Sequence, residues 1–148
     1  QFLHATMDNN FKVGNDALPT AGKIAVQSPK FMANIGLNYQ NGPYYANLSF
    51  KWVDSQYSTF MNNQSMPAYK TVDLGFGYHF PSYGPLHNAT LSLNFTNLTN
   101  VRYLSSVATV VGTAKSMRGV YGTTIAAGTP AYYMAAPLGV MMNLSTDF

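Results

Sequence analysis

Residues able to do chemistry are few and widely spaced in this chain of 148 residues. The absence of cysteine excludes disulfides, thiol catalysis and Cys-ligated zinc. His4, His79 and His87 are separated by expected turns and lack the spacing of metal ligands. Asp73 and His79 share one face of one expected strand, but six strand steps put them about 20 Å apart. We therefore expect no catalytic residues, no metal site and no cofactor.

The overall composition narrows the class of protein. Only 9% of the residues are charged, against roughly 25% in soluble globular proteins. The net charge of +3 is too small to indicate nucleic-acid binding, and 14% aromatic residues argue against disorder. No segment approaches the ~20 consecutive apolar residues of a membrane-spanning helix. The surface of this protein must therefore be compatible with its surroundings through features other than charged side chains.

The elements that position the side chains are β-strands, because apolar and polar residues alternate with a period of two. In residues 31–40, Phe31, Ile35 and Leu37 fall on one face, while Asn34 and Asn38 fall on the other. The same alternation recurs in 44–53, 71–80, 91–96 and 138–148, and more weakly in 1–8. The sequence thus predicts an all-β fold, an antiparallel up-and-down meander of about six strands.

Two features favour a membrane barrel over a soluble sheet. The polar face carries Asn, Ser, Gly, Thr and Gln rather than Lys and Glu, which suits a crowded aqueous lumen. Aromatic residues gather near the strand ends, as they do at the two membrane interfaces of such barrels. One end has Tyr39, Tyr44, Tyr78, Phe80 and Phe148, and the other has Trp52, Tyr69 and Tyr103.

The connection lengths indicate the same architecture. They alternate between long and short, at 9–29, 41–43, 54–67, 81–88 and 104–130. Outer-membrane barrels have short periplasmic turns and long external loops. Six strands fall below the smallest barrel of about eight, and open edges in lipid would leave many backbone groups unpaired. We therefore expect these strands to be part of a larger barrel.

Several segments resemble one known family, the TonB-dependent outer-membrane receptors. Asn97–Tyr103 (NLTNVRY), which follows an expected strand, is similar to the NLFNKRY-like segment of these receptors. Residues 39–46 and 69–80 look like their late barrel strands, and 132–148 resembles their closing strand with its terminal Phe148. The resemblance implies that residues 1–148 are the C-terminal part of a barrel domain of about 22 strands, without the plug domain.

The same resemblance implies a location, a function and partners. The location is the outer membrane of a Gram-negative bacterium, and the function is uptake of an iron chelate such as a siderophore. The partners are the rest of the barrel, the plug domain, the TonB system through that plug, lipopolysaccharide and membrane lipid. Phe148 resembles the C-terminal signal read by the barrel-assembly machinery, although it also fits the lower aromatic girdle.

Given short periplasmic turns, all eight basic residues fall on the external half of the chain, with only three of the acidic ones. Such an excess attracts an anionic ligand such as a metal chelate. Contact with lipopolysaccharide phosphates, or plain solvation, explains the same charges. The aromatic residues of the loops either form a contact surface for the ligand or belong to the upper aromatic girdle and pack on one another. Arg102 either meets the plug as a lumen-facing charge or forms a salt bridge at the rim. The ligand-binding candidates are Lys115, Arg118, Tyr121, Tyr57, Phe60 and Arg102.

Two other classes of protein remain open from the sequence. One is a different outer-membrane barrel, such as a porin or a surface-binding protein. The other is a soluble β-sandwich binding module, in which the apolar face would be buried in a two-layer core. Its core would then contain Leu74, Phe76, Leu91, Leu93, Val140 and Met142.

Overall fold

The computed structural model describes residues 1–81 and 87–147, which form two compact units. The sheet unit comprises Ala33–Trp52, Lys70–Arg102 and the residues from Ala136 on. The loop unit comprises Gln1–Met32, Val53–Tyr69 and Tyr103–Ala135. Among the described residues, no helix is long and apolar enough to cross a membrane.

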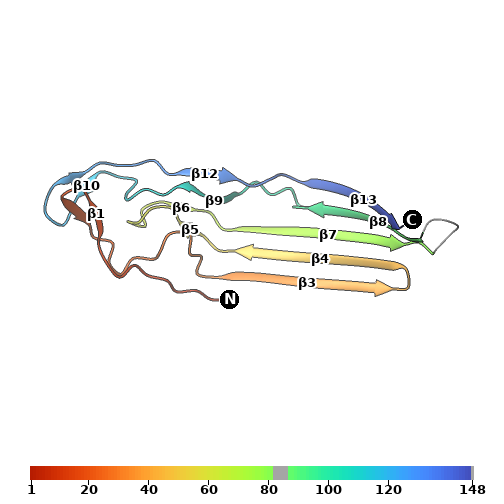
Figure 1. Cartoon of the computed structure of the whole chain (residues 1–148). Coiled ribbons are helices and arrows are strands. Elements are labelled where there is room, and N and C mark those ends of the chain that lie inside the picture. The colour runs from red at the N-terminus through yellow and green to blue at the C-terminus, as the bar shows by residue number, and fades with distance from the viewer. Residues whose placement is uncertain (82–86, 148) are drawn as a thin grey trace. The chain divides into compact units, whose positions relative to one another are not determined.

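The sheet unit is built on one sheet of five strands in the order β13-β8-β7-β4-β3 (Figure 1). As predicted, β3 and β4 are joined by a tight turn, in which Gly42 adopts a φ of 54°. The second predicted short turn, 81–88, falls largely on residues 82–86, outside the described residues. The strands are β3 (Met32–Asn41), β4 (Tyr44–Val53), β7 (Tyr69–His79), β8 (His87–Thr96) and β13 (Gly139–Asp147).

The strand register confirms the predicted division into two faces. Phe76 pairs with Leu93, which pairs in turn with Met142, so the apolar residues of three strands form one row. The adjacent set of paired residues is Gly77, Ser92 and Asn143. These residues form a polar row on the opposite face. One face of this sheet is therefore apolar from strand to strand, and the other is mainly polar.

Neither face of the sheet unit encloses a hydrophobic core. Leu37 is 63% exposed, and Met142 and Leu144 are each 70% exposed. This contradicts the β-sandwich alternative, because none of the six side chains expected in its core is buried. Among the described residues, every buried apolar side chain lies in the loop unit: Ala17, Leu18, Val53, Met66, Val107 and Ile125.

The polar face is crowded, and glycines on β7 provide the space. A Cβ atom on Gly75 would lie 2.7 Å from the Oδ1 atoms of both Asn47 and Asn94. A Cβ atom on Gly77 would collide with the ring of Tyr45. Glycine is therefore required on this face so that the longer side chains of the neighbouring strands can lie over the sheet.

The loop unit contains more regular structure than the sequence predicted. Three segments of the long connections form antiparallel hairpins, and residues 104–109 pair with residues 131–134, just beyond the last connection. Its strands are β1 (Phe11–Val13), β2 (Asp16–Leu18), β5 (Gln56–Tyr57), β6 (Ser65–Met66), β9 (Leu104–Thr109), β10 (Met117–Arg118), β11 (Thr124–Ile125) and β12 (Ala131–Met134).

One predicted strand is not formed, whereas the strands predicted at 91–96 and 138–148 are found. The expected strand 1–8 forms only isolated bridges, Phe2 to Phe31 and Thr6 to Ile24. The predicted strand 91–96 is part of β8, which ends at Thr96 as its alternation indicates, because Asn97 turns the chain with a φ of 52°. The predicted strand 138–148 corresponds to β13, and a separate short strand, β12, precedes it; Pro137, which has no N–H to donate, lies between them.

Candidate functional site

Three of the six ligand-binding candidates lie on one segment of the loop unit, the β10–β11 hairpin and the residues before it. Arg118 ends β10, Tyr121 is in the turn, and Lys115 precedes the hairpin; all three side chains are exposed. Tyr121 is 76% exposed. A cationic side chain and an aromatic ring are thus presented to solvent a few residues apart, a combination suited to an anionic ligand with apolar parts.

The turn of this hairpin is fixed by Asp16. From the sequence, Asp16 was only one of the three acidic residues placed on the external half, without a role of its own. Its Oδ1 atom accepts hydrogen bonds from the amides of Ala17 at 2.7 Å and Tyr121 at 2.8 Å. Its Oδ2 atom accepts from the amide of Thr123 at 2.9 Å and from the Thr123 hydroxyl. The contact joins residues 107 positions apart, so no local pattern in the sequence could have revealed it.

These hydrogen bonds keep Asp16 ionised. The Thr123 hydroxyl, followed by the Tyr121 amide, lowers the pKa of Asp16 from 3.8 to about 2. A carboxylate whose pKa is lowered by folding stabilises the folded state at pH values above its pKa in the unfolded chain. This contribution is lost as the pH falls through about 2. The charge, and the turn that it holds, therefore persist at neutral and mildly acidic pH.

Lys115 and Phe60 are held by a second set of contacts within the loop unit. Phe60 donates its amide to Val111, and its ring packs on Phe11 with 4.4 Å between ring centroids. The Thr113 hydroxyl donates to the carbonyl of Lys115 at 2.7 Å. Phe60 is thus placed by packing between loop segments, whereas the Lys115 side chain extends from a fixed backbone into solvent.

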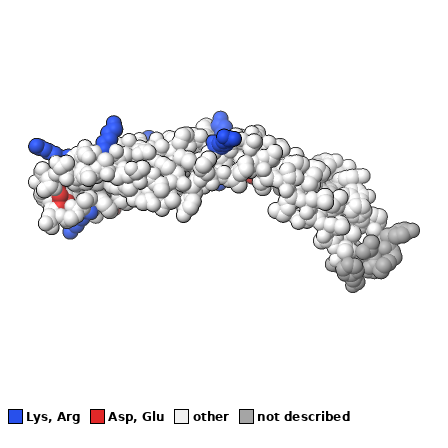
Figure 2. All heavy atoms as spheres, turned by 90° about the horizontal axis from the view of Figure 1, so that it is seen from above, with Lys and Arg blue, Asp and Glu red and all other residues white. Residues whose placement is uncertain are grey.

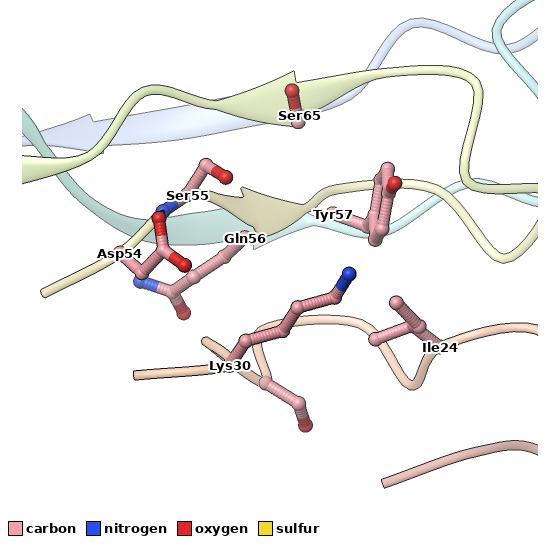
Figure 3. Close-up of a pocket in the computed structure, with 8 residues that line it drawn as sticks. Ile24, Lys30, Asp54, Ser55, Gln56, Tyr57 and Ser65 are labelled. Atoms are coloured by element: carbon pink, nitrogen blue, oxygen red, sulfur yellow. Dashed lines mark hydrogen bonds between the residues drawn. The ribbon is translucent and has the colours of Figure 1, made fainter. Parts of the chain in front are cut away.

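Tyr57 lies elsewhere in the loop unit, in a small cleft of about 190 Å³ (Figure 3). Lys30 and Asp54 extend side chains of opposite charge into this cleft, without an ion pair between them in the described structure. The cleft is smaller than the ~300–1,000 Å³ of typical ligand pockets, so it suits only part of a ligand. It is lined by Ile24, Ser28, Lys30, Asp54, Ser55, Gln56, Tyr57 and Ser65.

The remaining predicted residues are not part of this arrangement. Arg102 is exposed and belongs to the sheet unit, whereas the other five candidates belong to the loop unit. Phe148 lies outside the described residues, so its role as an assembly signal stays a prediction. Within the described chain, no group of three or more His, Cys, Asp or Glu side chains is arranged to hold a metal ion.

Comparison with known proteins identifies the family. The family described as TonB dependent receptor-like, beta-barrel, matches residues 3–98, about two thirds of the chain. The chain therefore belongs to this family, and with it to the outer-membrane proteins of Gram-negative bacteria. This confirms the predicted class and favours a receptor over a porin. No curated protein is similar enough to this sequence to count as a relative.

Three solved structures share the fold. The ferric citrate transporter FecA, in its unliganded form, is 18% identical and matches 90% of this chain with a TM-score of 0.63. The siderophore receptor PiuA from Acinetobacter baumannii is 15% identical over 95% of this chain, with a TM-score of 0.67. BauA, the ferric preacinetobactin receptor from the same species, is 25% identical over 87% of it, with a TM-score of 0.60. The matched part is 19%, 17% and 16% of those three chains, respectively.

Proposed function

We propose that this chain forms the C-terminal part of the barrel of an outer-membrane receptor that takes up an anionic iron chelate. In this proposal the sheet unit is barrel wall and the loop unit forms part of the external binding site. A plug domain and the TonB system supply the gated path and the energy for uptake, so the chain acts by binding and transport rather than by catalysis. Its family and the iron-chelate receptors that share its fold support this function.

The observation that carries the proposal is the charge of the external hairpin. Lys115 and Arg118 are exposed, whereas the nearby carboxylate of Asp16 is only 4% exposed and is occupied by hydrogen bonds. Lys and Arg side chains project from the surface in Figure 2, and acidic surface is sparse beside them. The hairpin therefore offers positive charge to a ligand, while the carboxylate next to it is occupied by the amides of the turn.

The test removes this charge in the intact receptor. We expect the double variant Lys115→Gln/Arg118→Gln to weaken binding of ferric citrate, used as the probe, by roughly tenfold or more, because hydrogen bonds from charged groups are lost. The measurement is a binding titration of the purified receptor at two salt concentrations. The loss should be smaller at high salt, where the charges are screened.

A second double variant, Lys23→Gln/Lys51→Gln, removes the same total charge outside the hairpin and serves as the control. An equal loss of affinity in both double variants would assign the effect to the overall field of the protein. Unchanged affinity in the Lys115→Gln/Arg118→Gln receptor would remove this hairpin from the binding site and leave lipopolysaccharide contact or solvation as the role of its charges.

A further inference from the structure

The turn of the β10–β11 hairpin has little of its own to hold it in place. Within it, Gly119 donates to the carbonyl of Thr123 at 2.8 Å, and Gly122 donates to Gly119 at 3.1 Å. Gly122 has a φ of 92°, a conformation that other residues rarely adopt. Val120 and Tyr121 are 49% and 76% exposed, so apolar packing contributes little. A glycine-rich turn of this kind is mobile unless another part of the protein fixes it.

Asp16, at the start of the buried strand β2, holds this turn in place. All three residues of β2 are buried, and Leu18 is fully buried, so the Asp16 carboxylate starts from a rigid position. The carbonyl of the neighbouring Ala17 also accepts a hydrogen bond from the amide of Val120 at 2.8 Å. The amides of Val120, Tyr121 and Thr123 and the Thr123 hydroxyl thus donate to two adjacent residues of β2.

Gly119 shows that the fit around this carboxylate is close. A Cβ atom on Gly119 would collide with the carboxyl carbon and both oxygens of Asp16. Because Gly119 has no positive φ, its lack of a side chain is explained by this approach and not by backbone conformation. The turn and the carboxylate therefore fit together as one clamp, defined by Asp16, Gly119, Tyr121 and Thr123.

We propose that Asp16 is the positioning residue of the external binding site: it holds the β10–β11 turn in a single conformation and so fixes where Arg118 and Tyr121 meet the ligand. The ligand part of this inference rests on the proposed function. A turn that is already ordered loses less conformational entropy when a ligand binds, so the clamp raises affinity without contacting the ligand. The carboxylate itself is unavailable to ligand because its oxygens face the turn.

The test compares four variants of the intact receptor by two measurements. Hydrogen exchange of the segment 117–125, without ligand, reports whether the turn is held; titration with ferric citrate reports the binding site. We expect Asp16→Asn to speed exchange of this segment roughly tenfold or more and to weaken binding, because an amide presents N–H groups where only acceptors fit. Thr123→Val, which removes one hydroxyl, should have a smaller effect of the same kind, and Thr123→Ser should behave as wild type.

Asp8→Asn is the matched control, because Asp8 is an exposed carboxylate of the same loop unit. It should change neither measurement. Unchanged exchange in both Asp16→Asn and Thr123→Val would overturn the clamp, and faster exchange with unchanged affinity would overturn its role in positioning ligand residues. If wild-type receptor fails to bind ferric citrate, the proposed function fails for this chelate, and the exchange data alone decide whether Asp16 holds the turn. Thr123→Val keeps the test decisive if Asp16→Asn does not fold.

Discussion

Replacing Leu37 with arginine should lower the free energy of unfolding of the intact receptor by about 2–4 kcal/mol, the cost of a basic side chain at the middle of the lipid-facing surface of a barrel. Leu37 lies near the middle of β3 and is 63% exposed on the apolar face. In a membrane this exposed face meets acyl chains, which cannot solvate a guanidinium group. Reversible urea unfolding of the receptor in lipid vesicles measures the loss.

The control is the next residue along the same strand. Asn38 belongs to the polar face, so Asn38→Arg should cost much less than Leu37→Arg. The two variants carry the same new side chain at almost the same depth and differ only in the face that they change. Equal costs, or a larger cost for Asn38→Arg, would contradict the assignment of the apolar face to lipid.

Replacing Asn97 with alanine should destabilise the receptor by about 4 kcal/mol, because three backbone groups lose their partner in a buried position. The Asn97 side chain donates to the carbonyls of Val101 at 2.9 Å and Ala136 at 3.1 Å, and accepts from the amide of Val101 at 3.0 Å. Its own amide donates to Asp73 at 2.8 Å, and its side chain is only 5% exposed. Asn97 thus joins the end of β8 to the segment that leads into β13.

Asn100 provides a control with the same backbone conformation, since φ is 52° at Asn97 and 51° at Asn100. Asn100 is exposed, and its side chain accepts one hydrogen bond, from Leu138 at 3.1 Å. We expect Asn100→Ala to cost about 1–2 kcal/mol, chiefly for the left-handed conformation and this one bond. Similar losses in the two variants, measured by the same urea unfolding, would show that the buried hydrogen bonds of Asn97 contribute little.

The sheet could be predicted because each strand carries its own signal. Alternation with a period of two places Leu91 and Leu93 on one face whatever the rest of the chain does. The turn at Gly42 could be predicted from an equally local sequence signal. The end of β8 at Thr96 was predicted, but the contacts that fix the turn at Asn97 were not, because they join its side chain to Val101 and to the distant Ala136.

The loop unit could be predicted only in part. Basic and aromatic residues can be assigned to external loops from connection lengths, which is how Lys115, Arg118 and Tyr121 became candidates. Their placement depends on contacts such as Asp16 with Thr123, which are distant in sequence and leave no periodic pattern. The cleft beside Tyr57 was missed for the same reason, because it is lined by residues from three separate segments.

The central claim is that the apolar face of the sheet meets lipid and the polar face meets water. Its most direct test is the accessibility of single spin labels on residues 34–39 of β3, in the intact receptor in bilayers; this chain has no cysteine of its own to replace. We expect labels at 35, 37 and 39 to be reached by oxygen dissolved in the lipid, and labels at 34, 36 and 38 by a water-soluble nickel complex. Accessibility that does not alternate, or that alternates in the opposite phase, would contradict the claim.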